Sequence, residues 1–466
     1  MNDIGLIGLG VMGKNLALNI GNKGFSVSVF NMTTRKTKDF IEKEIENRDI
    51  TGYCDIESFI QSLKKPRKIV LMIKAGEPVD GMIEKLVPYL DKGDLIIDGG
   101  NSYYFDTIRR IKELNDKGIL FLGMGVSGGE AGALHGPSLM PGGTKKAYDL
   151  VEDILLKIAA QTEEGPCCTY VGDGAAGHFV KMIHNGIEYG MMQAISEAYD
   201  ILKKVLKLSS DEIADVFGRW DEGELNSFLM EISSKVMRHK DEETGKPIVE
   251  LILDKAGQKG TGKWTTEAAF NIGIPAPSLS VAVEGRILSY FKEDRVNLSR
   301  KINKEYPKDS YDKEKIIEGL EDSLLFSYLI LFSQGLWIIS EASKDYDFNI
   351  DISEVLRIWK GGCIIRCEML DFVGEIVKRY NENVNLLNDD RALKFLMEKT
   401  DSVKNVVNIA RDFYIPTLVH NTALDYFFSM IEERLPANLI QAQRDFFGAH
   451  TYNRVDKEGI YHTVWE

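Results

Sequence analysis

The sequence has few cysteines and no excess of basic residues, and both shortages argue against whole classes of protein. Its five cysteines, an odd number, are Cys54, Cys167, Cys168, Cys363 and Cys367, with no CxxC pair and no nearby histidine. This pattern argues against a disulfide framework or a zinc site and is typical of reduced thiols in the cytoplasm. With 57 basic against 71 acidic residues, the net charge of −14 argues against a nucleic-acid or anionic-membrane binder.

The sequence also lacks the features of a targeting peptide and has one long uncharged stretch. The first apolar run is broken by glycines and has no basic region before it, so no signal peptide is predicted. Residues 323–340 are uncharged for 18 positions, near the lower limit for a membrane span. Because Ser327, Ser333 and Gln334 lie inside this stretch, we expect a buried helix, with a membrane span as the less favoured alternative.

Residues 1–175 alternate short apolar runs with amphipathic segments, in a chain of 466 residues that is too long for one core. The runs are DIGLI, FSVSVF, IVLMI, LIIDGG and ILFLGMGVSGG. Continuous apolar runs bounded by glycines predict parallel strands that are covered on both faces. We therefore expect a doubly wound, Rossmann-like α/β domain whose carboxyl strand ends form a ligand crevice.

A glycine-rich turn follows the first predicted strand and opens a helix. It consists of Gly8, Leu9, Gly10, Val11, Met12 and Gly13. Such a turn lets a pyrophosphate approach the backbone, so dinucleotide binding is favoured over a purely structural turn. The second strand ends in NMTTRK at 31–36, without the acid that bonds the ribose of NAD. Hydroxyls beside Arg35 and Lys36 favour NADP, unless these cations are only a solvated helix start.

A second, all-helical domain is expected over 176–435, because strand patterns end there. Its first predicted helix, 177–199, carries a polar stripe at i, i+3, i+4 and i+7. Apolar residues surround the stripe, so its polar groups are either functional or a satisfied buried cluster. The stripe consists of Lys181, His184, Asn185 and Glu188.

An internal echo provides a comparison for the polar stripe. ISEA at 195–198 recurs at 339–342, which predicts two related helical halves. The same shift along the chain aligns the four stripe residues with apolar or aromatic residues typical of a core, which are Leu325, Tyr328, Leu329 and Phe332. This difference between the two copies favours a functional stripe. The tail 436–466 is rich in aromatic residues, so we expect it to dock on a protein surface.

Three further loops collect polar groups, at 98–102 (DGGNS), 125–129 (GVSGG) and 259–264 (KGTGKW). The first two follow strands, and the third offers an ammonium and a hydroxyl suited to a phosphate. With GLIGLGVMGKNLALNI, GHFVKMIHNGIEYG and QAQRDFFGAH, these motifs closely resemble the 6-phosphogluconate dehydrogenase family over essentially the whole chain. That family is part of the β-hydroxyacid dehydrogenases.

The resemblance implies a metal-independent, NADP-linked oxidative decarboxylation of 6-phosphogluconate to ribulose 5-phosphate. It implies Lys181 as the general base and Glu188 as the acid that protonates C1 of the enediol. From the residues alone His184 would be the expected base, because its reference pKa is about 6.5 against about 10.4 for lysine. The implied substrate contacts are Asn101, Ser127, Gly128, Gly129, His184, Asn185, Tyr189, Lys259, Thr261, Arg286, Arg444 and His450.

The resemblance also implies a homodimer in which Arg444 and His450 of the tail reach the site of the other subunit. One departure concerns the cofactor, since the family commonly has an arginine where this chain has Met32. We therefore expect Thr33 and Arg35 to contact the 2′-phosphate. Further expected cofactor contacts are the glycine turn, Asn31, Met32, Lys74, Ala75 and Asn101. An unphosphorylated β-hydroxyacid substrate and a non-catalytic NADP-binding protein are the alternatives.

Overall fold

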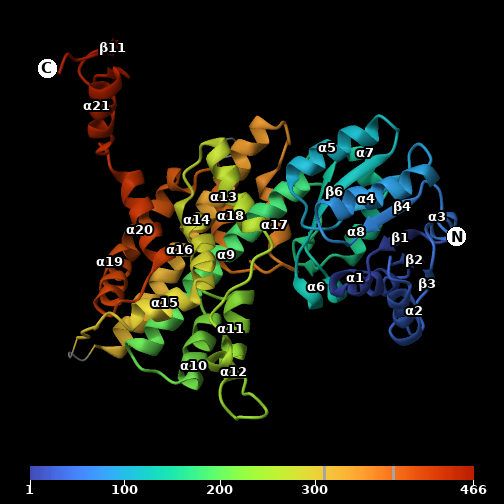
Figure 1. The fold of residues 1–466 in the computed structure, drawn as a ribbon, viewed down its shortest axis with the longest axis horizontal. Helices are drawn as coiled ribbons and strands as arrows, with labels where there is room; N and C mark the ends of the chain where they lie inside the picture. The colour runs from blue at the N-terminus through green and yellow to red at the C-terminus, as the bar shows by residue number, and fades with distance from the viewer. Residues whose placement is uncertain (308–310, 380–383, 466) are drawn as a thin grey trace. The chain divides into compact units, whose positions relative to one another are not determined.

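A seven-stranded sheet forms the amino-terminal part of the chain (Figure 1) in the order β3-β2-β1-β4-β5-β6-β7. The structure is a computed structural model and describes residues 1–307, 311–379 and 384–465. Adjacent strands are parallel, except that β7 runs antiparallel to β6. The strands are β1 (Ile4–Ile7), β2 (Val27–Phe30), β3 (Ile50–Tyr53), β4 (Lys68–Leu71), β5 (Leu95–Asp98), β6 (Leu120–Val126) and β7 (Leu139–Gly143).

Helices cover both faces of the sheet, because alternate residues of buried parallel strands point to opposite sides. One buried cluster joins the strands to α1, α2, α7 and α8, and the other joins them to α3, α4 and α5. The predicted Rossmann-like domain is confirmed. These helices are α1 (Val11–Asn22), α2 (Thr34–Lys43), α3 (Ile56–Gln61), α4 (Glu77–Leu86), α5 (Tyr104–Asn115), α6 (Gly129–His135), α7 (Lys145–Asp149) and α8 (Glu152–Ile158).

Two strands, β3 and β7, were not among those predicted, and β7 makes the sheet mixed rather than purely parallel. The sequence of β7, LMPGG, reads as a turn because it contains Pro141 and two glycines. Gly142 of β7 is required by packing, since a Cβ there would overlap the backbone of Gly177. The close approach places the first turn of the following long helix directly on the sheet.

Two long helices, α9 (Ala176–Lys204) and α16 (Lys313–Asp345), pack against each other in the helical part (Figure 1). The predicted all-helical architecture after the sheet is confirmed. The other helices of this part are α10 (Ser210–Asp221), α11 (Phe228–Arg238), α12 (Ile248–Leu251), α13 (Thr261–Ile272), α14 (Pro277–Tyr290), α15 (Lys292–Ser299), α17 (Ile352–Trp359), α18 (Met369–Val377), α19 (Asp390–Asp412) and α20 (Leu418–Ile431).

Helix α16 contains the long uncharged stretch and is apolar enough to span a membrane. However, 94% of its most apolar window is buried inside the protein, as the interpretation as a core helix requires. The four residues predicted as core counterparts of the polar stripe are all buried in it. In both halves the long helix is followed by a short one with a buried tryptophan, Trp220 in α10 and Trp359 in α17. The internal duplication itself stays a prediction.

The chain divides into two compact units, Met1–Ala423 and Leu424–Glu466. The smaller unit holds most of α20, all of α21 (Ala437–Gly448), and a short antiparallel pair, β10 (Tyr452–Asn453) and β11 (Ile460–Tyr461). The finer division predicted from the sequence, into 1–175, 176–435 and 436–466, stays a prediction.

Candidate active site

The polar stripe lies on α9, on a face buried against the sheet and the neighbouring helices. Lys181, His184 and Asn185 are all less than 10% exposed. The Nζ of Lys181 donates to Oδ1 of Asn185 at 2.7 Å and lies 3.4 Å from Nδ1 of His184. Glu188 lies one turn further along, with its Oε2 3.8 Å from the same imidazole nitrogen. The structure therefore brings the four predicted side chains together.

Glycines make room for this helix. A Cβ on Gly125, in β6, would collide with the Cβ of Lys181. Gly177, in the first turn of α9, lies so close to the carbonyl oxygens of Gly123 and Met140 that it could carry no side chain either. These contacts set the start of α9 against β6 and β7, so that Lys181 lies at the carboxyl end of β6.

The tautomer of His184 follows from its neighbours. Its Nδ1 lies 3.1 Å from Oδ1 of Asn185, and because an amide oxygen only accepts, the proton is on Nδ1. Its Nε2, 3.2 Å from Oγ of Ser127, therefore accepts from that hydroxyl. Ser127 precedes Gly128 and Gly129, whose positive φ angles of +99° and +62° turn the chain into α6.

Burial dominates the electrostatics of the stripe. Desolvation lowers the pKa of Lys181, against the opposing charge of Glu188. Desolvation, with a smaller contribution from Lys181, places the pKa of His184 well below its ordinary value of 6.5. Desolvation likewise raises the pKa of Glu188, although Lys181 and Arg286 act in the opposite direction. The amine and the carboxyl are thus both biased toward their neutral forms.

A second group of predicted residues surrounds the start of α13. Nδ2 of Asn185 donates to Oγ1 of Thr261 at 3.2 Å, which joins the polar stripe to this group. The guanidinium of Arg286 lies 3.4 Å from the centre of the Tyr189 ring, a stacked cation–π arrangement. Burial lowers the pKa of Arg286. Lys259 is exposed in the loop before α13, so cationic groups from two elements border one region.

The glycine turn has the geometry that dinucleotide binding requires. Gly8 has φ +105°, and a Cβ on Gly13 would collide with the carbonyl oxygen of Gly8. The N–H of Leu9 donates to Oδ1 of Asn31 at 3.0 Å, which ties the turn to the end of β2. The first turn of α1 has no side-chain cap and no acidic residue, so it can accept an anionic group.

The predicted 2′-phosphate contacts lie at the surface beside β2. Thr33 precedes α2 and its hydroxyl makes no capping bond. Arg35 is 88% exposed and lies 3.5 Å from Asp39 on its own helix. Met32 is exposed too, and Nζ of Lys85, from α4, lies 3.9 Å from its sulfur. No local pattern indicates Lys85, because it reads as a solvated residue on an amphipathic helix.

The other predicted loop residues, Lys74, Ala75 and Asn101, lie after β4 and β5 at the same edge of the sheet. Lys74 and Asn101 are exposed. Arg444 and His450 belong to the smaller unit, where both are exposed, and their contact with substrate stays a prediction. Among the described residues, no group of three or more His, Cys, Asp or Glu side chains is arranged to hold a metal ion.

A Rossmann-like sheet with a glycine turn, joined to a buried helix that carries lysine, histidine, amide and carboxylate, defines a dinucleotide-binding protein of the dehydrogenase class. Residues 3–172 match the NAD binding domain of 6-phosphogluconate dehydrogenase, and residues 177–465 match the C-terminal domain of the same enzyme. The chain belongs to the 6-phosphogluconate dehydrogenase family, which confirms the resemblance of its motifs.

Individual relatives match the chain from end to end. The NADP(+)-dependent, decarboxylating 6-phosphogluconate dehydrogenase of Bacillus subtilis is 50% identical over 99% of this chain and 98% of its own. A decarboxylating enzyme of Spinacia oleracea is 48% identical over 99% of this chain and 97% of its own. The solved structure of Plasmodium falciparum 6-phosphogluconate dehydrogenase, studied with NADP+ and with 6-phosphogluconate, superposes with a TM-score of 0.95 at 44% identity, covering 99% of this chain and 100% of that one.

Proposed function

We propose that this chain catalyses the NADP-dependent oxidative decarboxylation of 6-phosphogluconate to ribulose 5-phosphate and carbon dioxide. The observation that carries the proposal is the buried amine of Lys181, whose pKa is lowered by desolvation, in a chain that matches its family over its full length. A lysine that is neutral can accept a proton, which an ordinary ammonium cannot.

Lys181 is the general base of this proposal. Its Nζ takes the proton of the 3-hydroxyl. Bound NADP would supply the acceptor for the hydride that leaves C3. The resulting ammonium then donates to the C3 carbonyl oxygen and stabilises the charge that develops as carbon dioxide leaves. Asn185 holds the amine at 2.7 Å through both steps, since its Oδ1 accepts from either protonation state of the lysine.

Glu188 is the acid that protonates C1 of the enediol, while the hydroxyl of the enediol returns its proton to the amine of Lys181 as the ketone forms. Its pKa is raised by desolvation, which favours the protonated carboxyl that this role requires. Glu188 lies two helical turns from Lys181, about 10.5 Å of rise along the axis, which suits groups that act on different carbons of an extended sugar acid. His184 and Ser127 orient the substrate between them, with the imidazole neutral.

The phosphate of the sugar is bound at the other end of the site. Arg286, stacked on Tyr189, offers a guanidinium of fixed orientation, and Thr261 adds a hydroxyl. Lys259 contributes a charge from the loop before α13. An unphosphorylated hydroxyacid would leave these cations without an anion, which favours the phosphorylated substrate.

The glycine turn fits NADP. The tight backbone at Gly8 and Gly13 packs α1 closely on the turn, and the space beside Gly10 is open. The uncapped start of α1 would bond the pyrophosphate there. Thr33 and Arg35 remain candidates for the 2′-phosphate. We add Lys85, because its ammonium lies against Met32, the residue that replaces the family's arginine, and its only polar contact among the described residues is that sulfur.

Replacing Lys85 with Gln tests this addition. We expect kcat/KM for NADP to fall about tenfold and kcat/KM for NAD to stay unchanged, because a charge-assisted bond to the 2′-phosphate is lost. Lys92→Gln is the matched control, since Lys92 is exposed before the amino end of β5, at the opposite edge of the sheet. An equal loss for both cofactors, or none for either, would remove Lys85 from the cofactor site.

Mixing the purified protein with NADP and 6-phosphogluconate tests the proposed activity itself. We expect NADPH absorbance to rise together with carbon dioxide release in equal amounts. Absence of NADPH formation, or its formation from 3-hydroxyisobutyrate but not from 6-phosphogluconate, would overturn the proposal.

We further propose a cytoplasmic homodimer with three parts, 1–175 for the cofactor, 176–435 for substrate and dimerisation, and the tail 436–466 docked on the partner. The match of both family domains along the chain supports the first boundary. Apolar side chains exposed on α13 and α15, such as Phe270 at 77% and Leu298 at 59%, support an interface.

A further inference from the structure

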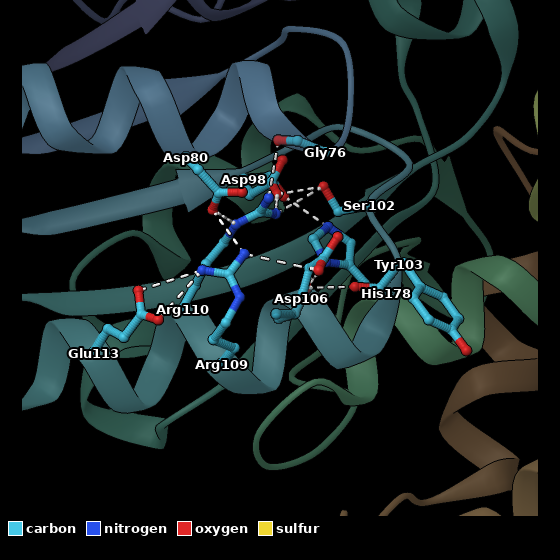
Figure 2. A network of polar contacts seen from close by, with 11 residues as sticks. Gly76, Asp80, Asp98, Ser102, Tyr103, Asp106, Arg109, Arg110, Glu113 and His178 are labelled. Atoms are coloured by element: carbon cyan, nitrogen blue, oxygen red, sulfur yellow. Dashed lines mark hydrogen bonds and ion pairs between the residues drawn. The ribbon is translucent and has the colours of Figure 1, made fainter.

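Arg110, on α5, makes four hydrogen bonds although its side chain is only 1% exposed (Figure 2). Its Nε donates to Asp80 at 2.7 Å, and one terminal nitrogen donates to the carbonyl oxygen of Gly76 at 3.0 Å. The other terminal nitrogen donates to Asp98 at 3.3 Å and to Ser102 at 3.4 Å. Arg110 is not among the residues that the motifs predict to contact substrate or cofactor. Its surrounding sequence, IRRIKEL, is typical of a solvent-exposed helix.

The partners of Arg110 belong to two different loops at the carboxyl edge of the sheet. Asp98 and Ser102 bound the loop 98–102 after β5, and Gly76 ends the loop 72–76 after β4. The two loops touch directly, since a Cβ on Gly100 would lie 3.1 Å from the carbonyl oxygen of Ile73. The guanidinium of Arg110 is therefore hydrogen-bonded to both loops.

The loop 98–102 is itself tightly bonded. Asp98 accepts from the backbone N–H of Gly100 at 3.0 Å and from the hydroxyl of Ser102 at 2.6 Å. Its carbonyl oxygen accepts from Nε2 of His178 at 3.0 Å, which connects the loop to the first turn of α9 (Figure 2). Burial lowers the pKa of His178, so the imidazole is neutral and links the loop to α9 by a hydrogen bond. The network thus extends from α4 to the helix of Lys181.

Energy alone does not explain a buried arginine at this position. Removing two charges from water costs much of what their attraction returns, so a buried ion pair contributes more to a defined geometry than to stability. The planar guanidinium fixes three directions at once, and the ammonium of a lysine could not reproduce them. Arg110 is therefore suited to setting the relative position of the two loops.

We propose that Arg110 is a positioning residue that fixes the loop 72–76 relative to the loop 98–102, and so fixes the nicotinamide relative to the sugar. This inference rests on the proposed function and on the contacts that the family resemblance implies, in which Lys74 and Ala75 contact the cofactor and Asn101 contacts both ligands. Hydride transfer requires the two reacting carbons at a defined short separation, so loosening these loops lowers the rate of that step.

Arg109 provides a matched control. It is the neighbouring arginine, is 43% exposed, and also donates to Asp80, at 2.9 Å (Figure 2). Its other partners are Asp106 and Glu113 on its own helix, so it bonds to neither loop. Arg109→Lys changes the same residue type in the same helix without touching the loops.

Hydrogen exchange tests the anchoring independently of activity. In Arg110→Lys we expect amides of 72–76 and 98–102 to exchange about tenfold faster, and both to change together, whereas Arg109→Lys leaves them as in the parent. Should Arg110→Lys fail to fold, Ser102→Ala removes one acceptor of Arg110 and one donor to Asp98, and we expect about a threefold acceleration. Unchanged exchange in both loops would overturn the proposal.

Kinetics with 6-phosphogluconate deuterated at C3 test the catalytic consequence. We expect Arg110→Lys to lower kcat at least tenfold, to raise KM for NADP, and to increase the deuterium isotope effect, because hydride transfer becomes slower than the other steps. A variant that is merely less folded loses kcat but keeps its KM and isotope effect, and that result would contradict a positioning role. If the parent does not oxidise 6-phosphogluconate, the proposed function fails, and the exchange experiment still decides whether Arg110 anchors the loops.

Discussion

At the level of single residues, desolvation determines which group on α9 can act as a base. The sequence indicates the polar stripe but not the order of its pKa values, and by reference values His184 would be preferred. Burial lowers the pKa of both His184 and Lys181. An imidazole whose pKa lies well below 6.5 is a weak base, while a lysine with a lowered pKa moves toward the working range. The lowered pKa of Lys181 agrees with the role that the family resemblance implied, and that role stays a prediction.

Lys181→Met tests this order of basicity. We expect kcat to fall at least a thousandfold with nearly unchanged substrate affinity, because the hydroxyl proton has no acceptor while the other contacts persist. Turnover by stopped flow and binding by calorimetry measure the two effects. Lys204→Met, at the exposed end of the same helix, is the control and should remain fully active.

The pH profile of kcat/KM separates the two candidate bases. In the proposed mechanism Lys181 acts as the neutral amine, so activity should fall as the pH drops below its lowered pKa. Glu188 acts there as the acid, so activity should also fall above its raised pKa. His184→Asn should keep the acidic limb at lower overall activity. Loss of that limb in His184→Asn, or near-normal turnover in Lys181→Met, would return the base role to the histidine.

At the level of elements, the buried and uninterrupted strands could be predicted and the edge strands could not. In β3 (ITGY) only Ile50 is buried, so the strand has no apolar run. In β7, Pro141 is tolerated because a sheet edge leaves its missing N–H without consequence. Lys85 and Arg110 were not predicted for a related reason, since each contacts residues on distant elements and the pattern of its own helix gives no sign of this.

In the tail, one buried carboxylate, Asp445, accepts hydrogen bonds from four groups. Its Oδ1 accepts from the backbone N–H of Thr451 at 3.0 Å and from Nδ1 of His462 at 2.9 Å. Its Oδ2 accepts from the N–H of Thr463 and from the indole of Trp465, each at 3.0 Å. Burial alone would raise the pKa of Asp445, but these donors lower it to about 2. The turn carrying His450 is therefore closed by this carboxylate at neutral pH.

Asp445→Asn should open the tail without unfolding the rest of the chain. The side-chain amide of Asn would present N–H donors to groups that are themselves donors. We therefore expect at least tenfold faster chymotryptic cleavage at Tyr452 and Tyr461 and a shifted Trp465 emission. Asp456→Asn is the control, since Asp456 pairs with Arg454 at the surface. In the parent the carboxylate keeps its stabilising charge above about pH 4 and loses it only as the pH falls toward 2. Equal cleavage of Asp445→Asn and the parent would contradict this.

At the level of the whole molecule, each compact unit exposes apolar side chains that a monomer would not need. Ile252 and Phe270 are 61% and 77% exposed in the larger unit, and Leu439 and Phe447 are 62% and 72% exposed in the smaller one. Surfaces of this kind mark association sites in soluble proteins. Composition alone indicated only that the tail docks on a protein, because a sequence does not say whose surface a helix covers.

Truncation after Pro436 tests whether the tail both holds the dimer and completes the site. We expect a weaker dimer by light scattering and at least a hundredfold lower kcat/KM for 6-phosphogluconate, because Arg444 and His450 are removed together with the apolar face of α21.

The full-length double variant Arg444→Gln, His450→Gln separates the two roles of the tail. It should lose a similar factor in kcat/KM while remaining dimeric, since Leu439 and Phe447 are retained. A truncated chain that is monomeric and fully active would show that each subunit completes its own site. A dimeric truncated chain of low activity would instead assign the interface to the larger unit and leave the tail a purely substrate-binding part.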